Sequence, residues 1–133
     1  MAKFFEWDPG QYDLKIAKMD ADHQAIVDCM NRLHALHETA GGRSALAAAF
    51  DQLLRVTARH FADEEVYMQK IGFPDAGRHA MIHKQLLGRI EHFHQDFKAK
   101  DALTEEFFHF LKMWLKAHIC GIDTKYAAHG RAL

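Results

Sequence analysis

The sequence predicts an all-α protein, an antiparallel up-down-up-down four-helix bundle with an irregular N-terminal arm. The chain of 133 residues contains only two prolines. It is rich in Ala, Leu, Met, Glu, Gln and Lys, residues that favour helix over strand. Breaks at 41–42, 72–77 and 98–101 divide the chain into four long segments. Because the breaks are short, consecutive helices are expected to be antiparallel neighbours.

We expect residues 1–133 to form one domain. Residues 1–12 are the predicted arm, because Phe4, Phe5 and Trp7 precede Asp8-Pro9-Gly10 in a pattern too irregular for a helix and too apolar to extend into water. Residues 13–133 are expected to form the bundle and a C-terminal tail. The four helices are predicted at 20–38, 44–70, 76–97 and 104–120.

Helices of a bundle bury positions spaced alternately three and four residues apart. In the first predicted helix, which ends before Gly41-Gly42, these positions are Met19, His23, Ile26, Met30, Leu33 and His37. In the second, which ends before Gly72-Phe73-Pro74, they are Leu46, Phe50, Leu53, Thr57, His60, Glu64, Tyr67 and Ile71.

The last two helices follow the same spacing. The third, bounded by the polar break at 98–101, has the inward positions His79, His83, Leu86, Ile90, Phe93 and Phe97. The fourth has Phe107, Leu111, Trp114 and His118. Every helix therefore directs at least one imidazole into the core, in a chain with 11 histidines.

Charge and hydropathy limit the possible partners. The formal net charge of −1 gives no basic surface for nucleic acid or anionic lipid. No apolar run approaches the roughly 18–20 residues of a spanning helix, and MAKFFEWDPG does not resemble a signal peptide. We therefore expect a cytoplasmic monomer with no nucleic-acid or membrane partner. Cys29 and Cys120 form no CxxC motif, and we expect two free thiols without a redox role.

The polar residues at inward positions favour a metal site. A buried carboxylate costs several kcal/mol unless it is paired or bound to a cation, and no inward position holds Lys or Arg. His60 with Glu64, and His79 with His83, are four residues apart and so about 40° apart around a helix. These two pairs, together with His23, already exceed the four ligands of an ordinary zinc site, and His118 adds another, so we predict two metal ions.

Distances from the second break support a common height in the bundle. His60 and Glu64 lie 12 and 8 positions before Gly72, and His79 and His83 lie 7 and 11 positions after it. In antiparallel neighbours, residues equally far from the connecting loop face each other. The two pairs are therefore expected to meet.

These residues match the pattern of a known family, and the chain resembles the bacterial hemerythrins over nearly its whole length. The family has a lone His on the first helix, HxxxE on the second, HxxxH on the third and HxxxxD on the fourth. The corresponding segments here are MDADHQ, HFADE, HAMIH and HICGID. Tyr126 and Gly72-Phe73-Pro74 are also similar to the family.

The resemblance implies a non-haem di-iron centre with an oxo or hydroxo bridge. It implies that His79, His83 and His118 hold one iron, that His23 and His60 hold the other, and that Glu64 and Asp123 bridge both. O2 would bind at the open position of the second iron, where NO or small anions could also bind. The implied O2 pocket is apolar and consists of Ile26, Phe61, Trp114, Leu115 and Ile119.

Helix geometry adds one expectation that the resemblance does not supply. Asp123 is five residues after His118, which in a regular α-helix turns it about 140° away from that histidine. We therefore predict a one-turn π-bulge or a helix break between these two residues, with Gly121 as a contributing residue.

Other signals are interpreted as structural. Two ExxH sequences, Glu91 to His94 and Glu106 to His109, are reminiscent of ferritin-like di-iron oxidases, but their positions around the helices predict solvated faces. Gly88 is expected to allow close approach of a neighbouring helix. His37 is predicted to be partly buried, and the histidines predicted at the surface are His34, His92, His109 and His129.

The leading functional hypothesis is reversible O2 binding for storage, transport or delivery, without enzymatic activity. A sensor of O2, NO or redox state is the alternative, and a di-iron peroxidase or oxidase is a third. The 133-residue chain includes no output domain beside the bundle, which favours carriage over sensing. The pocket residues offer no general acid or base, which disfavours an enzyme.

Overall fold

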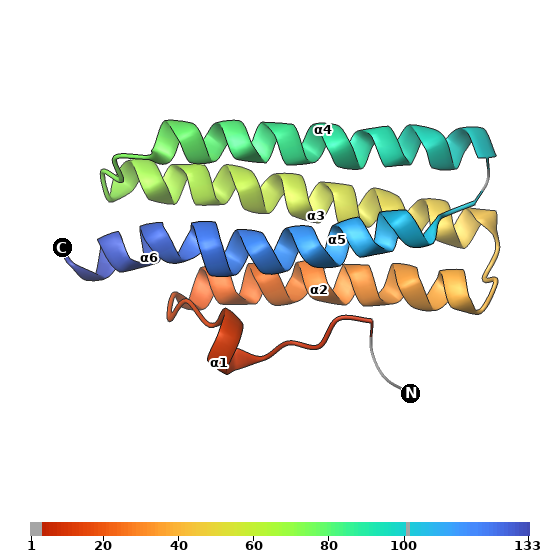
Figure 1. Cartoon of the computed structure of the whole chain (residues 1–133), viewed down its shortest axis with the longest axis horizontal. Coiled ribbons are helices and arrows are strands. Elements are labelled where there is room, and N and C mark those ends of the chain that lie inside the picture. The colour runs from red at the N-terminus through yellow and green to blue at the C-terminus, as the bar shows by residue number, and fades with distance from the viewer. Residues whose placement is uncertain (1–3, 101) are drawn as a thin grey trace.

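In the computed structural model, which describes residues 4–100 and 102–133, the four long helical rods lie side by side (Figure 1). They are α2 (Ala17–Glu38), α3 (Arg43–Lys70), α4 (Ala76–Lys100) and a composite fourth rod. The fourth rod consists of α5 (Glu105–His118), a π-helix (Ile119–Asp123) and α6 (Thr124–Arg131). All regular elements among the described residues are helical, which confirms the predicted fold class.

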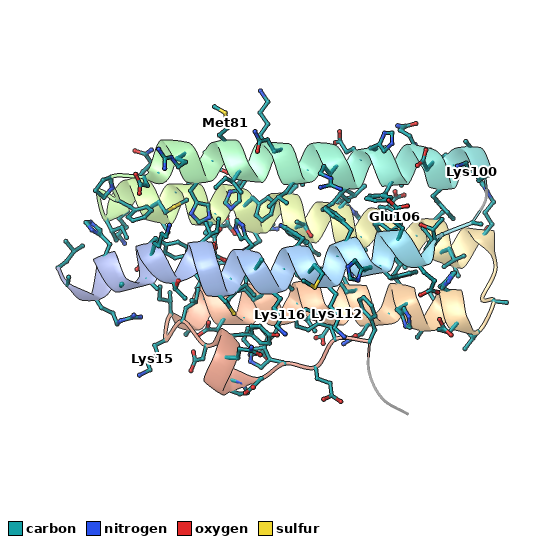
Figure 2. All side chains as sticks on the ribbon, in the orientation of Figure 1. Lys15, Met81, Lys100, Glu106, Lys112 and Lys116 are labelled. Carbon is teal, nitrogen blue, oxygen red and sulfur yellow. The ribbon has the colours of Figure 1, made fainter. Side chains whose placement is uncertain are left out.

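The N-terminal arm lies along α2 and reaches α5. The side chain of Asn31 accepts a hydrogen bond from the Phe5 backbone N–H at 2.8 Å and donates one to the Phe5 carbonyl at 2.9 Å. Phe4 stacks on His34, with ring centroids 4.5 Å apart. The Lys112 ammonium of α5 lies over the Phe4 ring, 5.6 Å from its centroid, on the side of the bundle that carries the arm (Figure 2).

The arm also contains one helical turn that the sequence analysis did not predict, α1 (Pro9–Tyr12). The Asp8 carboxylate accepts a hydrogen bond from the Gly10 N–H at 3.0 Å and caps the turn, and Pro9 occupies its first position. Both are standard features of a helix start. Residues 1–3 of the predicted arm fall outside the described residues.

Helix boundaries differ from the prediction mainly at the ends. The segment 98–100 is the last turn of α4 rather than a break, and Gly77 lies within α4; Asp101 is outside the described residues. The fourth rod continues to Arg131 instead of ending near residue 120. The turns before α3 and α4 contain Gly42 at φ 96° and Gly72 at φ 64°, a backbone region that glycine adopts without strain.

The predicted inward positions form the core, with four exceptions that are only half-buried: Tyr67, Ile71, Leu86 and Phe93. His37 is half-buried as predicted. At one end of the bundle the core is aromatic. Phe50 stacks on Phe107 at 4.9 Å and on Phe97 at 6.0 Å between centroids. The polar core residues are confined to the other half of the bundle, which is where α1, the α3–α4 turn and α6 lie (Figure 1).

Some isolated residues lie where the sequence predicts and others do not. Glu91, Glu106 and His109 are exposed, as expected, and so is His92. His94 was also expected on a solvated face, but it is half-buried, with its ring centroid 4.7 Å from that of Phe50. His34 and His129 are half-buried instead of exposed: His34 packs on Phe4, and the His129 ring lies 3.1 Å from the Ile71 carbonyl. A Cβ built on Gly88 would meet nothing within 4 Å, so the prediction of a close helix approach there was wrong. Both cysteines are free thiols.

Candidate metal centre

Seven polar side chains from all four rods meet in the core at one end of the bundle. They are the residues singled out from the sequence, and all are buried: His23, His60, Glu64, His79, His83, His118 and Asp123. His23 lies nearly two turns into α2, Glu64 lies near the end of α3, and His79 and His83 lie near the start of α4. The loop-distance argument for facing pairs agrees with this arrangement, since His83 Nε2 lies 2.9 Å from Glu64 Oε1.

The two carboxylates divide the five imidazoles into two groups. Glu64 Oε1 faces His83 and His79, at 2.9 and 3.4 Å, while its Oε2 faces His60 and His23, at 3.2 and 3.6 Å. Asp123 behaves in the same way. Its Oδ1 lies 3.1 Å from both His79 and His118, and its Oδ2 lies 3.1 Å from His23. One position is therefore surrounded by three imidazoles and the other by two, with each carboxylate reaching both.

Many of these donor atoms have no hydrogen-bond partner although they are buried. They are both ring nitrogens of His23, the Nε2 atoms of His60 and His83, Glu64 Oε1 and both Asp123 oxygens. A buried polar atom without a partner costs about 1–3 kcal/mol, and native proteins contain few of them. Bound cations would satisfy the oxygens and one nitrogen of each imidazole together. Imidazole and carboxylate suit several first-row metals, iron included, so the residues present fit a di-iron group.

Without metal, the contacts between these carboxylates and imidazoles shift the pKa values of both kinds of group. Burial opposes ionisation of Glu64, but contacts with His23, His60 and the α4 imidazoles hold its pKa well below the usual range. The pKa of Asp123 is lowered for the same reason, against the opposing effects of burial and of Glu64. Burial also opposes protonation of His23 and His79, yet the two carboxylates outweigh it and raise the pKa of each to about 9.

These shifts predict how the stability of the metal-free protein varies with pH. His23 and His79 have a pKa of about 9 when folded and 6.5 ordinarily, so their contribution is complete below pH 6.5 and is lost as the pH rises through 9. We expect the free energy of unfolding of metal-free protein, measured with urea, to fall by a few kcal/mol from pH 6.5 to 9.5. A His23→Gln variant should show a shallower fall. An equally steep fall in that variant would contradict a raised pKa of His23 in the folded protein.

Outer carboxylates orient two of the imidazoles. Asp22 Oδ2 lies 3.0 Å from His60 Nδ1, and Glu65 Oε2 lies 3.0 Å from His83 Nδ1. A carboxylate at Nδ1 keeps the proton on that nitrogen and leaves Nε2 free to bind a metal. The Lys18 ammonium donates hydrogen bonds to both Asp22 oxygens at 2.8 and 2.9 Å. It thereby connects the Asp22–His60 contact to the surface.

Asp22 and Glu65 were not identified from the sequence. Each is the chain neighbour of a site residue, His23 and Glu64 respectively, but reaches across to a histidine on another helix. Their half-exposed positions give no hydropathy signal. Only their adjacency to the motif residues could have indicated them.

Tyr126 of α6 contacts the centre directly. Its hydroxyl donates a hydrogen bond of 2.6 Å to Glu64 Oε2, the oxygen that faces His23 and His60. Burial and the charges of Glu64 and Asp123 raise the pKa of Tyr126, so the hydroxyl stays protonated and remains a donor.

Substituting Tyr126 with Phe is expected to lower the free energy of unfolding by about 2 kcal/mol, because the carboxylate loses a buried, charge-assisted hydrogen bond. Urea unfolding of the metal-free protein measures this change. Tyr67→Phe is the matched control, since the Tyr67 ring only packs edge-on against Tyr126, with centroids 5.7 Å apart. Equal losses in the two variants would contradict a specific role for the Tyr126 hydroxyl.

The π-helix at Ile119–Asp123 confirms the prediction drawn from the five-residue spacing. The extra residue in this turn brings Asp123 onto the same face as His118, and its carboxylate is fully buried rather than in solvent. Thr124 Oγ1 donates to the Cys120 carbonyl at 3.0 Å, which satisfies one backbone acceptor in the widened turn. Gly121 is exposed there.

The five predicted pocket residues are all buried: Ile26, Phe61, Trp114, Leu115 and Ile119. Phe61 stacks on His83, with centroids 3.8 Å apart and ring planes within 3°, and its edge meets Trp114 at 5.9 Å. An apolar surface therefore lies directly against the imidazoles.

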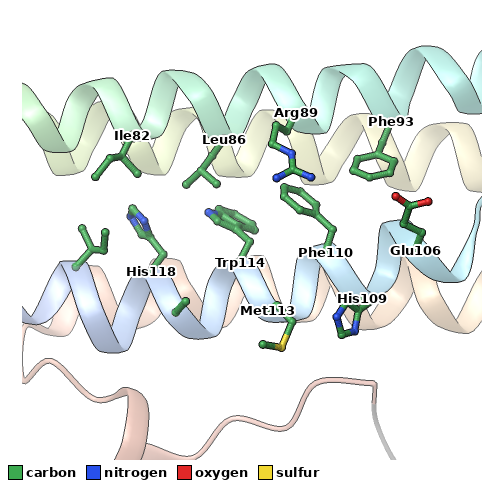
Figure 3. Close-up of a pocket in the computed structure, with 12 residues that line it drawn as sticks. Ile82, Leu86, Arg89, Phe93, Glu106, His109, Phe110, Met113, Trp114 and His118 are labelled. Carbon is green, nitrogen blue, oxygen red and sulfur yellow. The ribbon is translucent and has the colours of Figure 1, made fainter.

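A groove of about 590 Å³ opens between α4 and α5 and reaches the edge of the site (Figure 3). Leu86 and Trp114 face each other across it, and Ile82 and His118 lie at one end. Trp114 is the one member of the predicted pocket that also lines this groove. The groove thus borders the side with three imidazoles.

An antiparallel bundle with five imidazoles and two carboxylates shared between two core positions defines a four-helix protein built for a dinuclear metal centre. The comparisons with known proteins agree with this class. Residues 14–129 match the family model described as the hemerythrin HHE cation binding domain. The chain belongs to the hemerythrin family.

Named relatives support this assignment. The chain is 32% identical to a bacteriohemerythrin of Stenotrophomonas maltophilia, over 92% of this chain and 80% of the relative. It is also 32% identical to a myohemerythrin of Riftia pachyptila, over 92% of this chain and 90% of the relative. A crystal structure of wild-type hemerythrin superposes with a TM-score of 0.85 at 30% identity, covering 93% of this chain and 95% of that one.

Proposed function

We propose that the protein binds O2 reversibly at a di-iron centre held by the seven core residues. The observation that carries this proposal is the unequal division of donors. The position near His79, His83 and His118 has five protein donors, counting one oxygen from each carboxylate, and the position near His23 and His60 has four. The second position therefore has room for an exogenous ligand.

Two ferrous ions in such a centre supply the electrons that reversible O2 binding requires. The chain's own residues hold and insulate them. Glu64 and Asp123 offset positive charge, and the outer contacts of Asp22 and Glu65 keep the imidazole tautomers fixed. Ile26, Phe61, Trp114, Leu115 and Ile119 exclude water and provide no general acid or base, which favours binding over turnover.

We propose carriage, storage or delivery rather than catalysis, with NO or small anions as further ligands of the four-donor position and with the monomer as the working form. Within the described residues, none of the helices combines the length and apolarity needed to cross a membrane.

The test is to measure iron per chain and the visible spectrum through cycles of anaerobic reduction and exposure to air. We expect about two irons per chain and a colour that appears with O2 and disappears when O2 is removed. Fewer irons, or a spectrum that does not respond to O2, would overturn the proposal. Rapid peroxide consumption would instead favour an enzyme.

His60→Ala tests the four-donor position separately. This variant should retain the iron at the five-donor position, lose the other and no longer bind O2, because His60 is one of only two imidazoles there. His92→Ala is the control, since His92 is exposed on α4 and far from the core. Retention of both irons and of O2 binding in His60→Ala would show that the ligand assignment is wrong.

A further inference from the structure

A second group of potential metal ligands lies at the opposite end of the bundle. His37 and Glu38 are at the end of α2, and Glu105 is the first residue of α5. One ligand atom from each lies within 4.8 Å of the other two. We call these three residues the terminal cluster. His37 comes fourteen residues after His23 on the same helix, about 21 Å away along its axis, so the terminal cluster is separate from the core site.

Aromatic packing holds the histidine of the terminal cluster in place. The His37 ring lies against Phe108 of α5, with centroids 5.0 Å apart. The neighbouring His34 ring is fixed between Phe4 and Phe108, at 4.5 and 4.9 Å, and its Nε2 lies 3.5 Å from Glu38 Oε1. Both rings are half-buried, whereas the two carboxylates are exposed. The imidazole of His37 is therefore positioned before any ion binds, with the exposed Glu105 carboxylate already beside it.

The distance between His37 and Glu105 suits metal coordination better than hydrogen bonding. His37 Nε2 lies 3.4 Å from Glu105 Oε1, which is longer than the usual 2.7–3.2 Å of an N–H···O hydrogen bond. Tetrahedral zinc with bonds of about 2.0–2.2 Å places its ligand atoms about 3.4 Å apart. An imidazole with two carboxylates is a donor set that zinc accepts, with water completing the fourth position.

We propose that the terminal cluster is a binding site for a divalent first-row metal ion such as Zn²⁺, which links the end of α2 to the start of α5. The site draws its residues from two segments far apart in the sequence. A bound ion therefore stabilises this end of the bundle, and more strongly as the free metal concentration rises. The proposal is independent of the function assigned to the core centre.

The test uses the full chain with its iron loaded, so that the core site cannot take up the probe ion. Calorimetric titration with Zn²⁺ is expected to show one site per chain, and Co²⁺ is expected to give the visible absorption of a tetrahedral complex. Both His37→Ala and Glu105→Gln should weaken Zn²⁺ binding at least tenfold. His92→Ala is the matched control, because His92 forms an exposed pair with Asp96 at 3.8 Å on α4 without a third ligand.

Unchanged affinity in both His37→Ala and Glu105→Gln would overturn the proposal, as would the absence of Zn²⁺ binding to the wild-type chain at millimolar concentration. Iron content and visible spectrum are measured in the same samples. Zn²⁺ uptake matched by iron release would assign the binding to the core site and would also overturn the proposal. Failure of the O2 test with normal Zn²⁺ binding would affect only the proposed function.

Discussion

Replacing Glu64 with Ala is expected to remove both metal ions from the protein. Glu64 contributes one oxygen to each position, 2.9 Å from His83 and 3.2 Å from His60. Its loss takes a ligand and a negative charge from both positions at once, which no single histidine substitution does. Metal analysis after reconstitution with ferrous iron should find less than one iron per chain, compared with about two in the unmodified protein.

Glu65→Ala is the matched control for this experiment. Glu65 is the next residue on α3, but it touches only the outer nitrogen of His83, at 3.0 Å. Losing such an outer contact typically weakens metal binding by about 10–100-fold without removing a ligand. The control should therefore still take up two irons when iron is in excess. Two irons per chain in Glu64→Ala would rule out a bridging role for this carboxylate.

Inserting one alanine after Gly121 should abolish the centre by rotation alone. The π-helix at Ile119–Asp123 gives Asp123 its inward direction. One further residue turns everything C-terminal to it by about 100° and moves it about 1.5 Å along the axis. The insertion should therefore withdraw both Asp123 and Tyr126 from the core, and iron binding should fall below one per chain even though every ligand type is still present.

Deletion of Gly121 provides the opposite test. The aspartate would then follow His118 by four residues, about 40° around a regular α-helix, and would again face the core. Gly121 is exposed and a Cβ there would meet nothing within 4 Å, so the deletion removes no packing. We expect this variant to bind two irons. Equal iron content in the insertion and deletion variants would show that the helical register does not position Asp123.

Spacing within single helices accounts for most of what was predicted correctly. His60 with Glu64, and His79 with His83, needed only a period of 3.6 residues to be placed on one face. The distances of these pairs from Gly72 then placed them at one height. The π-helix was predictable because a buried Asp123 and a regular helix are incompatible, and the burial of Asp123 was itself implied by the family pattern.

Contacts between helices account for what was missed. Asp22 and Glu65 touch histidines on other helices, and their own sequence positions resemble those of any solvent-facing acid. Gly88 was assigned a close approach that does not exist, because a glycine within a helix indicates no particular neighbour. His34 and His129 were predicted at the surface, but the arm and the α3–α4 turn cover them.

Residue order alone was enough to predict the all-helical bundle, the inward faces of its helices and six of the polar residues that meet in its core. The seventh, Asp123, was identified only through the resemblance to the hemerythrin family. Periodicity and loop distance are local properties, so they can be derived from residue order. The tertiary structure decided which carboxylate oxygen faces which imidazole, how Tyr126 reaches Glu64 and where the terminal cluster forms. These features depend on the rotation and separation of neighbouring helices, which side-chain packing between segments far apart in the chain determines.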